Sequence, residues 1–137
     1  MTMLRPVGTP AETPTQAASV RQRSLTDAIP LRLALAMAAL WIVSIFVVFS
    51  IAPAPAADPT ATAIAVGVAF DLTVLGTLAG FAVLQRWGLL ASAAGGVVFL
   101  VGAGLCSLGG HTGGWLVAQY ITGAAILGVS QAAFRRF

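Results

Sequence analysis

The residue with the clearest capacity for chemistry is Asp71, which lies ten residues into a long apolar segment, residues 61–84. In a helix this distance is a rise of about 15 Å, which reaches the centre of a bilayer. An aspartate at that depth costs roughly 2.5 to 3.5 kcal/mol on insertion scales, so its presence calls for a role. Two roles are open: a proton- or cation-responsive site, or a neutral carboxyl that joins helices through a hydrogen bond.

Asp71 needs polar partners, and the sequence offers hydroxyl and amide groups in two other apolar segments. The expected partners are Ser44, Gln119, Tyr120 and Thr122. No arginine or histidine occurs near the middle of any apolar segment, so an ion pair with Asp71 is not expected within the chain. Gln119, Thr122 and Ser130 could also line a polar pathway. The competing interpretation is that such hydroxyls bond to their own helix backbone.

The remaining candidates for chemistry are weak. Cys106 is the single cysteine, so no internal disulfide can form, and His111 lies in a glycine-rich loop with too few ligands for a metal. The sequence contains no HExxH, CxxC, GxSxG or phosphate-binding motif. We therefore predict no catalytic residue, no metal site and no cofactor, and we do not expect an enzyme.

Four long apolar segments position these residues. The chain has 137 residues, of which 58% are hydrophobic and 8% charged, whereas about a quarter are charged in an ordinary soluble domain. About 20 apolar residues span a bilayer as a helix. The sequence predicts an all-α membrane protein, a four-helix transmembrane domain over residues 31–137 after a disordered cytoplasmic tail over residues 1–30. The predicted helices are residues 31–52, 61–84, 89–108 and 115–134.

The seven arginines give the orientation. With four helices, all of them fall on one side of the membrane, and basic residues near helix ends stay in the cytoplasm. We therefore predict a bacterial plasma-membrane protein with both termini cytoplasmic. The arginines would meet anionic lipids of the inner leaflet rather than nucleic acid. The segment Ala54-Pro55-Ala56 resembles a signal-peptidase site, but the preceding apolar segment is longer than a signal peptide requires, so the first helix is expected to remain.

Small residues at spacings of four suggest close helix packing, either within one chain or between chains. The residues in these patterns that we select as packing positions are Gly76, Gly80, Gly95, Gly102 and Gly128. The favoured function is that of a non-enzymatic accessory or assembly partner, as a homodimer or with another membrane protein. The alternative is a small oligomeric transporter or channel that uses Asp71 as its coupling residue.

Overall fold

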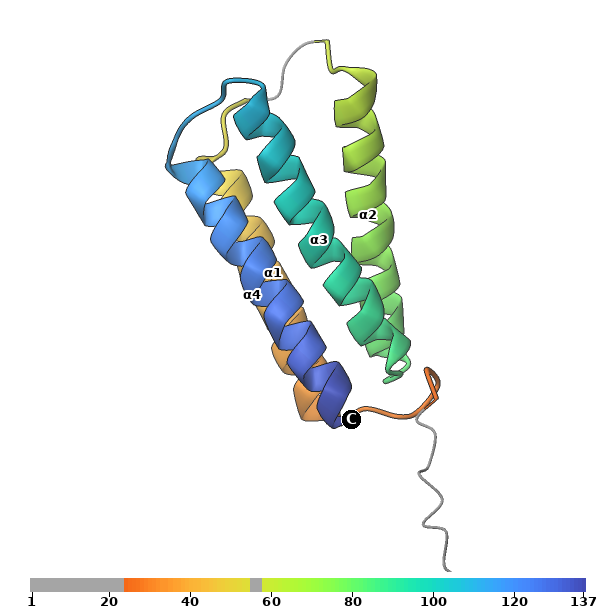
Figure 1. Ribbon diagram of the computed structural model, residues 1–137. Helices are drawn as coiled ribbons and strands as arrows, with labels where there is room; N and C mark the ends of the chain where they lie inside the picture. Colours follow the sequence, from red (N-terminus) through yellow and green to blue (C-terminus); the bar gives the residue numbers. More distant parts are fainter. Residues whose placement is uncertain (1–23, 55–57) are drawn as a thin grey trace, which may run out of the picture.

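Four helices make up the part of the chain that the structure describes. The structure is a computed structural model that describes residues 24–54 and 58–137 (Figure 1). The helices are α1 (Leu31–Ile51), α2 (Ala61–Ala82), α3 (Trp87–Leu108) and α4 (Gly114–Arg136). All four are long and apolar enough to cross a membrane, which confirms the predicted all-α class and the count of four such helices for the described residues.

The helix ends follow local chemistry. Pro53 cannot continue α1, which ends at Ile51. The Thr60 side chain caps α2 by accepting a hydrogen bond of 3.2 Å from the Ala63 N–H. Leu84 has a φ of 53°, and this left-handed residue turns the chain sharply between α2 and α3. The resulting connection is short, so α2 and α3 form an antiparallel pair.

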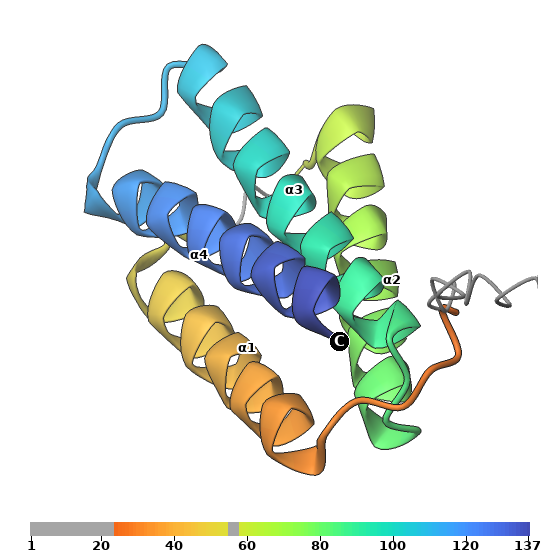
Figure 2. The same cartoon turned by 60° about the horizontal axis from the view of Figure 1, so that its bottom comes forward.

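Helix α3 lies at the centre of the arrangement and α2 at its edge. α3 packs against α4 on one side and against α2 on the other, while α1 lies mainly along α4 (Figure 2). Of the four helices, α3 has the largest buried share and α2 the smallest. Much of the surface of α2 is therefore left uncovered by the rest of the chain.

Residues 24–29, which we call the strap, have a defined position in the structure, although they belong to the segment that was predicted to be a disordered tail. The strap runs beside the α2–α3 connection through three backbone hydrogen bonds: from Ile29 N to the Leu84 carbonyl (2.7 Å), from Arg86 N to the Asp27 carbonyl (3.0 Å) and from Trp87 N to the Leu25 carbonyl (3.0 Å). Ile29 is buried in the hydrophobic core. Composition did not indicate this order, because the strap pairs through backbone groups that every residue type carries. The predicted tail before Ser24 lies outside the described residues.

Candidate functional site

A buried polar cluster joins three helices. The Trp41 Nε1–H of α1 and the Ser130 hydroxyl of α4 each donate a hydrogen bond of 2.8 Å to the Ser92 Oγ of α3. Two accepted bonds use both lone pairs of that oxygen. Gly95 makes room for the indole, because a Cβ there would lie 2.6 Å from the Trp41 ring. These polar groups therefore hold α1, α3 and α4 together and do not line an open passage.

Aromatic side chains next to this cluster set the orientation of α2. Phe70 packs edge-on against Phe99, with ring centroids 5.0 Å apart. The Phe70 ring also lies beside the Trp41 ring, at a centroid distance of 6.1 Å. Consecutive residues in an α-helix are turned by about 100°. Further along α2, Thr77 and Phe81 are also buried. With this side of α2 directed inward, Asp71 is left on the outer side.

Asp71 is exposed near the middle of α2, and it makes no hydrogen bond or ion pair with any residue that the structure describes. The structure does not bring it together with its four expected partners. Ser44 is buried in α1, and Gln119 donates a bond of 3.3 Å to the Phe99 carbonyl instead. Tyr120 lies 3.3 Å from the Ser107 hydroxyl, and Thr122 is half-buried in α4. A carboxyl group thus faces the lipid side of a candidate span.

The five glycines chosen from the sequence divide into two groups. Gly76, Gly80, Gly95 and Gly102 all face another helix of the same chain. The closest approach is between Gly80 and the Gly88 backbone, where α2 and α3 leave their connection. Gly128 instead faces outward, and a Cβ added there would meet nothing. The tight α3–α4 crossing is made by Gly96 and Gly123. Gly96 follows Ser92 at a spacing of four but is not among the five selected positions, and Gly123 belongs to none of the predicted small-residue patterns.

Arg86 forms a second buried polar site, at the end of the bundle where the strap and the C-terminus lie. It is only 4% exposed. Its guanidinium donates to the Ser24 carbonyl (3.1 Å) and to the Phe134 carbonyl (2.8 Å), and it lies 4.2 Å above the Phe134 ring. It therefore ties the strap, the α2–α3 connection and α4 to one another. In the sequence Arg86 contributes to the charge pattern, and its place in a very short connection between two long apolar segments is the signal for its burial.

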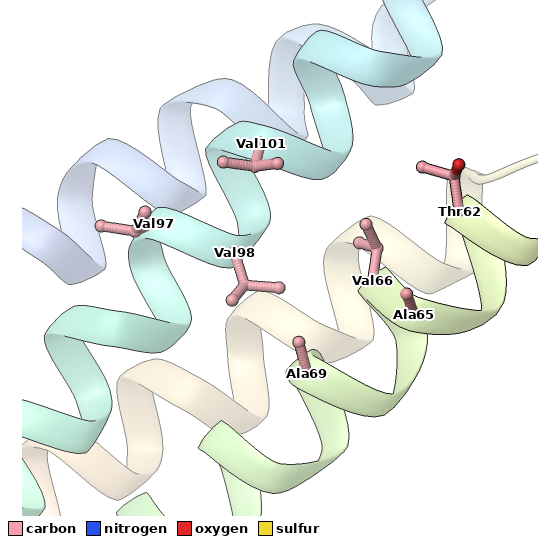
Figure 3. A pocket seen from close by; sticks show the side chains of 7 residues that line it. All are labelled: Thr62, Ala65, Val66, Ala69, Val97, Val98 and Val101. Carbon is pink, nitrogen blue, oxygen red and sulfur yellow. The ribbon is translucent and has the colours of Figure 1, made fainter.

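An apolar groove separates α2 from α3 toward the ends of these helices that lie farthest from Arg86 (Figure 3). Seven side chains line it: Thr62, Ala65, Val66, Ala69, Val97, Val98 and Val101. Asp71 does not belong to the lining. The groove and the carboxyl are therefore separate features, and the groove offers almost no polar group to a solute.

Comparison of the chain with protein-family models, with curated proteins and with solved structures finds no match. Within residues 24–54 and 58–137, no three His, Cys, Asp or Glu side chains gather so that they could hold a metal ion. The candidate functional residue that the geometry brings forward is Asp71, now on the outer face of α2.

Proposed function

We propose that this protein is a non-enzymatic, multi-pass plasma-membrane protein that acts as an assembly subunit and joins its partner through the outer face of α2. The observation that carries the proposal is the exposed position of Asp71 at the middle of a candidate span. Hydrocarbon offers this carboxyl no hydrogen bond, and an aspartate at that depth costs roughly 2.5 to 3.5 kcal/mol on insertion scales. A partner helix with a polar group at the same depth would remove that cost.

The interior of the chain supports assembly rather than catalysis or transport by one copy. The buried cluster of Trp41, Ser92 and Ser130 is hydrogen-bonded internally. The groove between α2 and α3 is apolar, and it lies apart from Asp71. Within residues 24–54 and 58–137, Asp71 is the one Asp, Glu or Arg near the middle of a helix, and its side chain is exposed on the outer side of the bundle.

The proposed orientation has both termini in the cytoplasm. The start of α1, the α2–α3 connection and the end of α4 lie at one end of the bundle (Figure 1), and these segments contain Arg32, Arg86, Arg135 and Arg136. Asp58 precedes α2 and His111 follows α3, so both belong to connections at the opposite helix ends. Basic residues favour the cytoplasmic side. The exposed arginines would then contact anionic headgroups of the inner leaflet.

The test of the assembly function is the size of the native particle. The wild-type protein, extracted with its lipids into nanodiscs, should carry more than one polypeptide. Asp71→Leu should shift it toward single chains without loss of thermal stability, because Asp71 makes no hydrogen bond or ion pair with the described residues of its own chain. Asp58→Leu makes the same chemical change outside the helices and should leave the particle intact. A wild-type particle of one chain would contradict the proposal.

A proton- or cation-coupled transporter is the second candidate, favoured by the same carboxyl at mid-span. This function predicts that Asp71→Asn abolishes solute flux in proteoliposomes while the particle keeps its size, since asparagine forms hydrogen bonds but cannot ionise. Flux equal to wild type in this variant would contradict transport through Asp71.

A further inference from the structure

Backbone carbonyls of the strap cover the N-terminal end of α3 (Figure 2). The N-cap residue of this helix, Arg86, makes no side-chain cap hydrogen bond. Its N–H donates to the Asp27 carbonyl at 3.0 Å, and the N–H of Trp87 donates to the Leu25 carbonyl at the same distance. A third strap carbonyl, that of Ser24, accepts from the Arg86 guanidinium at 3.1 Å. The strap thus occupies a helix N-terminus and a guanidinium, two groups with which proteins commonly bind anions.

The strap leaves the charge of Arg86 uncompensated. This side chain is 4% exposed, and its Nε–H has no hydrogen-bond partner among the described residues. Within residues 24–54 and 58–137, no carboxylate forms an ion pair with it. The Asp27 carboxylate accepts from the Ser24 N–H at 2.9 Å and not from the guanidinium. A buried charge is costly unless it is paired and its donors are satisfied, so this site suits an anion better than neutral carbonyls.

The outer part of the strap is held by hydrogen bonds and not by apolar burial. Ser24, Leu25 and Thr26 are all exposed, and the Leu25 side chain is 48% exposed. Ile29, in contrast, is 3% exposed, and its N–H donates to the Leu84 carbonyl at 2.7 Å. Residues 24–27 can therefore leave the end of α3 while Ile29 stays anchored in the core.

We propose that Arg86 and the N-terminus of α3 form a phosphate site, and that residues 24–27 are the lid that closes it in this structure. Opening the lid frees three N–H groups, those of Arg86 N, Trp87 N and Arg86 Nη1, and the unpartnered Nε–H is a fourth. Phosphate oxygens accept such bonds strongly, and the negative charge compensates the guanidinium and the helix dipole. Asp27 leaves with the lid, so its carboxylate does not stay to repel the phosphate.

The place of the site in the fold favours the phosphate of a lipid. The connection between α2 and α3 joins two candidate spans, and the ends of spans lie at the depth of the headgroups. A free phosphate ion offers the same oxygens, so the test includes both. The proposal is independent of the assembly function, because none of its residues lies on the outer face of α2.

Direct binding is measured by native mass spectrometry of the full chain in a maltoside detergent, which contains no phosphate. Added phosphatidic acid should bind as one molecule per chain, and diacylglycerol, which lacks the phosphate, should not. Arg86→Gln should weaken this binding about tenfold or more, the effect of losing one charge-assisted hydrogen bond. Arg136→Gln removes an exposed arginine from the same end of the bundle and should bind like wild type. Equal binding by the two variants, or equal binding of the two lipids, overturns the proposal.

Movement of the lid is measured on a chain that keeps Arg86, so this result does not depend on how Arg86→Gln folds. In a Cys106→Ser background, Thr26→Cys carries a nitroxide label on the lid. Leu108→Cys carries it at the opposite end of α3, where the side chain is 87% exposed. Phosphatidic acid should shift the label on residue 26 from an immobile to a mobile spectrum and leave the label on residue 108 unchanged.

Two outcomes separate the sources of the phosphate. A shift with phosphatidic acid but not with inorganic phosphate assigns the site to a lipid headgroup. The same shift with inorganic phosphate, and none with chloride at equal ionic strength, shows that the free ion is sufficient. A lid that stays immobile with both phosphate compounds, or moves equally with chloride or diacylglycerol, overturns the proposal.

Discussion

The Trp41 Nε1–H donates a hydrogen bond of 2.8 Å to the Ser92 Oγ across 51 residues of sequence. Both side chains are almost completely buried. This bond lies between α1 and α3, and Ser130 adds α4 to it. Lipid tails are as apolar as the helix surfaces, so apolar packing alone gives little preference for one arrangement of the helices. The hydrogen bonds to Ser92 therefore help to define how α1, α3 and α4 pack together.

Replacement of Ser92 by alanine should destabilise the bundle more than replacement of Trp41 by phenylalanine. Ser92→Ala leaves two buried donors without an acceptor, at about 1 to 3 kcal/mol for each, whereas Trp41→Phe removes one donor along with part of a ring. Thermal unfolding in mild detergent measures the difference. Ser50→Ala is the control, because Ser50 is exposed and bonds only to the Phe46 carbonyl of its own helix. Equal stability of Ser92→Ala and wild type would show that the cluster is unimportant.

Arg86→Lys should loosen the end of the bundle that the strap covers. Lysine keeps the charge but lacks the planar fork that reaches two carbonyls, so at least one charge-assisted bond is lost, worth about 1.5 to 3 kcal/mol. Faster proteolysis within the strap and a lower unfolding temperature are the expected results. Arg136→Lys, an exposed substitution at the same end, should behave like wild type. An Arg86→Lys variant as resistant to protease as wild type would contradict the role given to Arg86.

Gly123→Ala should separate α3 from α4, whereas Gly128→Ala on the same helix should be harmless. A Cβ on Gly123 would lie 2.9 Å from the Phe99 Cβ and 3.0 Å from the Gly96 carbonyl oxygen, while a Cβ on Gly128 would meet nothing. Overpacking of this kind costs about 1 to 3 kcal/mol. Unfolding temperatures of the two variants provide the comparison. A loss at Gly128 instead would mean that its open face is covered in the native particle.

The proposed orientation predicts different access to the two ends of the bundle. In a Cys106→Ser background, Thr112→Cys should react with an impermeant thiol reagent in intact cells. Phe137→Cys, at an exposed position of the other end, should react only after the cells are permeabilised. The reverse pattern would place the termini outside the cell.

The sequence was sufficient for the helices but not for their inward and outward faces. Runs of about 20 apolar residues predict spans, because backbone groups in lipid need helical partners. The same uniform apolarity hides which face is buried, so the sequence predicts partners for Asp71 inside the bundle, whereas the structure leaves its side of α2 exposed. The predicted partners are Ser44, Gln119, Tyr120 and Thr122. Trp41 is also informative in the sequence, because an indole N–H in the middle of a span needs a hydrogen-bond acceptor from another helix.

The contacts of Arg86 have a consequence for the order of synthesis. The carbonyl of Phe134 that accepts from its guanidinium comes 48 residues later in the chain. When α2 and α3 emerge from the ribosome, the strap is already available, but α4 is not. Until α4 emerges, the Arg86 guanidinium has one of its two side-chain hydrogen bonds, to the Ser24 carbonyl, and lacks the Phe134 ring over which it lies. The buried environment of Arg86 is therefore complete only after α4 has been synthesised.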